Sequence, residues 1–176
     1  MRPYKTSTAR TMTNSSAFKL GALLILLLTI QTSWLARFTL WGVHPDFALL
    51  LTVSVALLFG WRAGGVFGLC AGFMGGVLAA KNIGSFLLSR TLCGAVVGLS
   101  DRGFARDNIF APPLLAALGT LFSDFIVLLM SPTDFPLSWW LFHTPVKMLL
   151  HAILIWPLHF VVMKMCAPPA RSMFSS

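Results

Sequence analysis

Few side chains in this sequence could take part in chemistry, and most of them lie in apolar segments. Lys147, His151 and His159 fall within the last apolar stretch. The spacing of four residues places Lys147 and His151 on one face of a helix, with His159 two turns further along. Polar side chains at membrane depth require hydrogen-bonding partners. We expect these histidines to bond to backbone carbonyls or to face the membrane interface.

Metal binding and catalysis are not supported by the spacing of the candidate residues. No His-Glu-x-x-His sequence or Cys-x-x-Cys pair accompanies the histidines, and the three cysteines are scattered. The chain also has no Gly-x-Ser-x-Gly elbow, phosphate loop or paired carboxylates within one segment. A hydrolase triad of Ser123, Asp124 and His151 is conceivable, but nothing in the spacing selects it. We therefore expect a protein that is not an enzyme and has no cofactor or metal.

Arg90 and Asp124 are the ionisable residues most out of place, because each lies inside an apolar stretch. Ionisable groups at membrane depth face the bundle interior or water and usually pair. We expect these two to form a mutual ion pair. The pair could be a structural clamp or part of a path for a solute or proton, and Arg90 could instead snorkel from a shallow depth.

A ladder of glycines with a spacing of four is the strongest local pattern, formed by Gly64, Gly68, Gly72 and Gly76. This spacing places all four on one helix face, where the absence of side chains lets another backbone approach closely. Two uses remain open. The ladder could pack against a neighbouring helix of the same chain, which we favour, or it could dock the helix of a separate protein.

The composition places these residues in a membrane protein. Of 176 residues, 57% are hydrophobic and 10% are charged, with 13 Lys and Arg, 5 Asp and no Glu. The mean hydropathy is +0.82. A soluble domain has about 25% charged residues, so lipid is the solvent that suits this surface. The net charge of +8 does not indicate nucleic acid, since the basic residues are spread between apolar stretches rather than clustered.

We expect an all-α bundle of six transmembrane helices, since each helix needs about 20 mostly apolar residues. The proposed spans are 20–36, 45–59, 63–80, 83–99, 112 or 113 to 130, and 145–165, with Pro45, Pro113 and Pro145 each at a start. Residues 1–19 then form a basic N-terminal tail and residues 166–176 a short C-terminal tail. The basic start before 20–30 also resembles a signal peptide, but no small-x-small cleavage site follows, so we expect the first span to be retained.

Orientation follows from the Lys and Arg residues in the connections, because cytoplasmic loops carry the excess. An N-terminus in the cytoplasm places nine of them on that side: Arg2, Lys5, Arg10, Lys19, Arg62, Arg102, Arg106, Lys164 and Arg171. Arg37 and Lys81 lie in the connections on the other side of the membrane, and Arg90 and Lys147 are counted as belonging to helices. Both termini are therefore expected in the cytoplasm.

Several short segments follow one another in a recognisable order. They are Gln31, 44–51 (HPDFALLL), 60–64 (GWRAG), 72–78 (GFMGGVL) and 83–88 (IGSFLL), before the basic loop around Arg102 and Arg106. Together they resemble the bacterial rod shape-determining protein MreD family over about residues 20–165. Many members carry an Asp where this chain has Ala79, so any role of that acid cannot be transferred.

The resemblance implies a non-enzymatic component of the cell-elongation machinery in the bacterial inner membrane. Its implied partners are MreC directly and, through it, MreB, RodA and a penicillin-binding transpeptidase of peptidoglycan synthesis. It also implies a bundle similar to the substrate-binding subunits of ECF-type vitamin transporters. A small-solute-binding transporter subunit is therefore the alternative function, and it would require a cavity with convergent polar groups.

Overall fold

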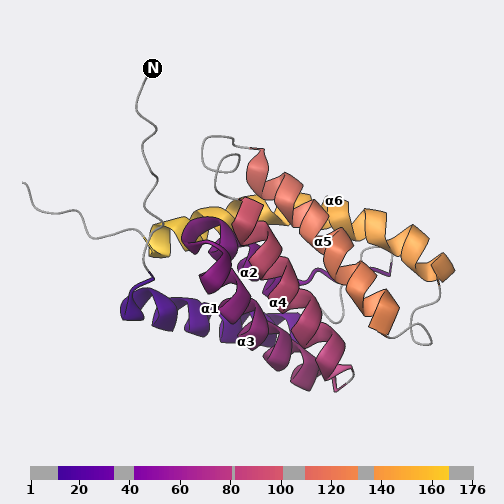
Figure 1. Cartoon of the computed structure of the whole chain (residues 1–176), viewed down its shortest axis with the longest axis horizontal. Helices are drawn as coiled ribbons and strands as arrows, with labels where there is room; N and C mark the ends of the chain where they lie inside the picture. The colour runs from indigo at the N-terminus through magenta and orange to yellow at the C-terminus, as the bar shows by residue number, and fades with distance from the viewer. Residues whose placement is uncertain (1–11, 34–41, 81, 101–109, 131–136, 167–176) are drawn as a thin grey trace, which may run out of the picture.

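The chain folds into a bundle of helices (Figure 1). The computed structural model describes residues 12–33, 42–80, 82–100, 110–130 and 137–166. Within these residues there are six helices: α1 (Asn14–Ser33), α2 (Phe47–Phe59), α3 (Trp61–Ala79), α4 (Ile83–Ser100), α5 (Ala111–Met130) and α6 (Leu137–Met165). The predicted all-helical fold is confirmed for this part of the chain. Eight of the eleven basic residues in the orientation count lie outside the described residues: Arg2, Lys5, Arg10, Arg37, Lys81, Arg102, Arg106 and Arg171.

Five of the helices are long and apolar enough to cross a membrane, and α2 is the exception. Two predicted starts are wrong. The first helix begins at Asn14 rather than near residue 20, so Lys19 lies on α1. The last begins at Leu137, so Pro145 lies inside α6 rather than at its start. Proline is tolerated within helices in a membrane, where neighbouring groups can satisfy the freed carbonyl.

Successive helices run up and down the bundle. The α3–α4 pair is antiparallel, because Gly98 near the end of α4 packs on Trp61 at the start of α3 while Gly76 packs on Ile83. Lys19 Nζ donates to Met165 O at 3.4 Å. The beginning of α1 and the end of α6 therefore lie at the same end of the bundle.

Helix α2 occupies the centre and contacts each of the other five helices. Every residue from 48 to 57 is buried, which fits a segment that is apolar on all sides. Its 13 residues measure about 20 Å at about 1.5 Å per residue, less than the roughly 30 Å hydrocarbon core. Asp46, Ala48 and Leu49 are 8%, 1% and 0% exposed, so the start of α2 lies inside the bundle rather than at its surface.

The glycine ladder of α3 faces the interior of the same chain. Gly64 lies opposite Gly94 and Ala56, Gly68 opposite Arg90 and Thr52, and Gly72 and Gly76 opposite the first turn of α4. A Cβ at Gly72 would lie 2.6 Å from Phe86 O and 2.8 Å from Leu87 Cα. The ladder thus serves close packing of α3 on α4 and α2, and all four glycines are buried.

Gly72→Ala should destabilise the protein by about 1–3 kcal/mol, because the added methyl group meets the α4 backbone, which cannot easily move. Gly75→Ala is the matched control on the same helix, since a Cβ there has nothing within 4 Å. It should be neutral or stabilising by up to about 1 kcal/mol from backbone entropy. Equilibrium unfolding in mixed micelles, followed by circular dichroism, measures the free energy of unfolding of each variant. Equal changes in the two variants would contradict the close α3–α4 contact.

Candidate functional site

A cluster of polar side chains lies around the buried start of α2. Its members come from α4, α5, α6 and the residue that precedes α2: Asp46, Arg90, Thr120, Asp124, Lys147 and His151. Arg90, Thr120 and His151 each lie near the midpoint of their helix. The cluster is therefore placed deep within the bundle, where an unpaired charge is most costly.

Asp46 is the residue at which the cluster is joined together. Its Oδ1 accepts from Leu49 N at 3.1 Å, so the carboxylate caps α2 and complements the positive end of the helix. Its Oδ2 accepts from Arg90 Nη2 in an ion pair. Asp46 and Arg90 are 8% and 3% exposed, which makes this a buried salt bridge.

The expected pairing of Arg90 with Asp124 is wrong. Arg90 reaches Asp46 instead, and its guanidinium carbon lies 4.7 Å from the centre of the Phe86 ring. Asp124 Oδ1 accepts from Lys147 Nζ at 2.7 Å. The sequence placed Asp46 at the start of the span 45–59, so it did not indicate that this carboxylate lies at the depth of Arg90, near the midpoint of α4.

His151 links three segments through both nitrogens of its ring. Asp46 N donates to His151 Nε2 at 2.9 Å, so this nitrogen is an acceptor. Thr120 Oγ1, 2.7 Å from His151 Nδ1, donates its own proton to Ala116 O at 2.7 Å. His151 Nδ1 must therefore carry the proton and donate to Thr120 Oγ1, which defines a neutral imidazole.

Helices α5 and α6 are joined by two polar contacts one turn apart. Thr120 and Asp124 are separated by four residues on α5, as are Lys147 and His151 on α6. The two pairs meet in antiparallel order, Thr120 with His151 and Asp124 with Lys147. The predicted shared face of Lys147 and His151 is thus turned towards α5 and α2.

The irregular backbone before α2 is satisfied by side chains. Phe47 N donates to Gln31 Oε1 of α1 at 3.1 Å, and Asp46 N donates to His151 as described. Backbone that is not helical is tolerated at membrane depth only where such partners are present. The contribution of Gln31 and Thr120 was not predicted; Pro45-Asp46 before an apolar run is the signature of a helix start that could have indicated the cap.

The remaining predicted residues lie outside this cluster. His159 is half-buried two turns beyond His151, and its Nδ1 has no hydrogen-bond partner among the described residues. Ala79 is the exposed last residue of α3. Ser123, Asp124 and His151 do not form a triad, since His151 uses both nitrogens on other partners. No group of three potential metal ligands occurs in the described part of the chain.

The cluster is balanced in charge, with the carboxylates of Asp46 and Asp124 opposite the cations of Arg90 and Lys147. Removing one partner of a buried pair leaves an uncompensated charge, whereas removing both does not. The arrangement is therefore suited to holding helices together at a fixed register. Together with Gln31, it connects α1, α2, α4, α5 and α6.

Arg90→Met should destabilise the protein by about 3–5 kcal/mol, because it strands the buried Asp46 carboxylate. In an Asp46→Asn background, where the cap is kept and the charge removed, the same change should cost much less. A double-mutant cycle from equilibrium unfolding measures this coupling. The control cycle combines Arg90→Met with Asp124→Asn and should be close to additive; a larger coupling there than with Asp46 would overturn the assigned pairs.

The ¹⁵N resonances of His151 should show a protonated Nδ1 and an unprotonated Nε2. Thr120→Val should shift the Nδ1 signal, because it removes the acceptor while keeping the side-chain shape. Thr91→Val is the matched control, since the Thr91 hydroxyl donates to Leu87 O on α4 at 2.7 Å. A doubly protonated ring, or equal effects of both variants, would refute the proposed hydrogen-bond chain.

Comparison with known proteins identifies no relative for the chain. No family model, no curated protein and no solved structure matches it. The proposed function therefore rests on the chemistry and arrangement of the residues and on the sequence resemblance described above.

Proposed function

We propose that this protein is a non-enzymatic, multi-pass membrane scaffold with six transmembrane helices and both termini in the cytoplasm. The observation that carries the proposal is the polar cluster around Asp46. Each of its two carboxylates is paired with a cation inside the bundle, which is the arrangement of a clamp between helices. A solute-binding subunit needs polar groups that converge on a cavity and stay available.

The proposed orientation is supported by the positions of the described basic residues. Lys19 and Met165 meet, so the start of α1 and the end of α6 share one end of the bundle. Arg62 at the start of α3 and Lys164 at the end of α6 belong to that end as well. An excess of positive charge favours the cytoplasmic side. Six alternating helices bring both termini there.

The proposed role is in the cell-elongation machinery of the bacterial inner membrane, with MreC as the direct partner. This part rests on the resemblance of about residues 20–165 to the MreD family. MreC would connect the scaffold to MreB, RodA and the transpeptidase of peptidoglycan synthesis. We expect α6 to present the docking face, because the glycine ladder of α3 is already covered by α4 and α2.

The outward side of α6 has the pattern that helix docking requires. Leu149, Ile153, Trp156 and Phe160 are between 48% and 67% exposed and recur at alternating intervals of four and three residues. This is the spacing at which the side chains of one helix fit between those of another. Such a row can receive a single transmembrane helix along most of its length.

Affinity purification of the tagged protein from native membranes, followed by mass spectrometry, tests the proposal. Recovery of MreC in near-stoichiometric amount is the expected result. Ile153→Ala with Phe160→Ala should lose MreC, while Leu69→Ala with Phe73→Ala, equally apolar and exposed on α3, should keep it. Recovery of an ATPase transporter module or a retained vitamin-like solute in place of MreC would refute the scaffold function.

A further inference from the structure

A row of polar side chains runs along the inward face of α6, from its first turns to its midpoint. Trp140, Thr144, Lys147 and His151 follow one another at intervals of four, three and four residues, which places them on one side of the helix. The row is about 16 Å long at about 1.5 Å per residue, which is about half of a hydrocarbon core about 30 Å thick. It therefore leads from the end of the bundle where α6 begins to the polar cluster.

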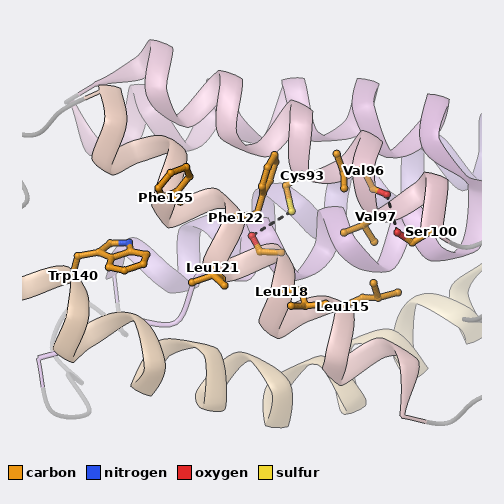
Figure 2. Close-up of a pocket in the computed structure, with 11 residues that line it drawn as sticks. Cys93, Val96, Val97, Ser100, Leu115, Leu118, Leu121, Phe122, Phe125 and Trp140 are labelled. Carbon is orange, nitrogen blue, oxygen red and sulfur yellow. Dashed lines mark hydrogen bonds between the residues drawn. The ribbon is translucent and has the colours of Figure 1, made fainter. Parts of the chain in front are cut away.

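The two outer members of the row have polar atoms that the protein leaves without partners. Thr144 is 2% exposed, and neither its Oγ1 nor Trp140 Nε1 has a hydrogen-bond partner among the described residues. Trp140 lies at an opening, since it lines a cavity of about 470 Å³ together with Leu121 and Phe125 of α5 (Figure 2). A buried hydroxyl without a protein partner costs free energy unless water bonds to it. The outer part of the row therefore has both a need for water and a way in.

The ion pair further along the row is itself accessible. The side chains of Lys147 and Asp124 are 20% and 15% exposed, whereas that of Arg90 is 4% exposed. Accessible ionisable groups at membrane depth face water rather than hydrocarbon. His151, the next member, is 0% exposed, and both of its ring nitrogens are bonded to protein groups. The accessible part of the row therefore ends at His151.

The same face of α6 is apolar on the other side of His151. Ile155, Leu158 and Val162 lie there and are 0%, 9% and 0% exposed. Leu158 comes seven residues after His151 and Thr144 seven residues before it, so the two halves of the helix differ in chemistry at equal distances from the polar cluster. A closely packed apolar face does not hold ordered water.

Two unpartnered polar atoms do lie in that other half, Ser54 Oγ on α2 and His159 Nδ1 on α6. They belong to different helices, and His159 is turned away from His151 by about 80° around the axis of α6, at about 100° per residue. Neither atom therefore extends the row beyond His151.

We propose that water enters the bundle along the inward face of α6, wets Thr144 and the Asp124–Lys147 ion pair, and stops at His151. Water is thus the ligand of this site, bound by Trp140 Nε1, Thr144 Oγ1 and the ion pair. The path is independent of the proposed scaffold role, because no partner helix takes part in it. The compartment to which it opens, opposite the cytoplasm, rests on the proposed orientation.

Solid-state NMR of the labelled protein in bilayers of phosphatidylethanolamine and phosphatidylglycerol tests the path without any substitution. Magnetisation that starts on water protons should reach the side chains of Thr144 and Lys147 several-fold faster than that of Thr52. Thr52 is the matched control, because it is 0% exposed and its hydroxyl donates to Ala48 O at 2.8 Å. Equal transfer to both threonines would overturn the proposal.

Cysteine accessibility measures on which side of His151 the path lies. The native cysteines are replaced by alanine, and Thr144→Cys and Leu158→Cys are each treated with sulfonatoethyl methanethiosulfonate on both faces of proteoliposomes, so the orientation of the protein does not affect the result. The thiolate is the form that reacts, and apolar surroundings suppress it. Thr144→Cys should therefore react several-fold faster, although Thr144 is 2% and Leu158 9% exposed. Equal reaction, or faster reaction of Leu158→Cys, would overturn the one-sided path.

Discussion

The cost of burying charge away from water is the constraint on which this structure depends. Asp46 places a carboxylate inside a membrane bundle, and this is tolerated because Arg90, the α2 backbone and the helix dipole all act on the same group. Once that pair is fixed, α4 has a defined position against the start of α2. His151 of α6 and Gln31 of α1 accept hydrogen bonds from the backbone N–H groups of Asp46 and Phe47. These bonds fix α6 and α1 against the start of α2.

Lipid removes the usual reason for apolar helices to associate, since the acyl chains are as apolar as the side chains. Two other kinds of contact hold the helices of this bundle together, each in a different part of it. On the α3 side, glycines allow backbones to touch, which gains dispersion contacts over a long interface. On the α5–α6 side, where such a ladder is lacking in the described helices, hydrogen bonds and an ion pair connect the helices. Both types of contact converge on α2, whose residues 48–57 are all buried among the other helices.

The result is a molecule in which the buried carboxylates are each paired with a cation, while many large apolar side chains of the described helices face outward. This distribution determines what kind of function the bundle can support. Paired charges stabilise one arrangement of the helices, while the apolar surface offers contact to whatever lies in the membrane.

The sequence by itself determined the helical class, the apolar character of the helices and the shared face of the four glycines, because these depend on composition and on spacing within one helix. The sequence also placed Lys147 and His151 on one face for the same reason. That the glycine face packs on α4 and α2 was decided by the tertiary structure. Only the tertiary structure decided the partners: Arg90 with Asp46, Asp124 with Lys147, and His151 with Thr120. Which charges meet depends on the depth and rotation of separate helices. A residue at a helix start, such as Asp46, reaches the middle of the bundle only because α2 is short and surrounded.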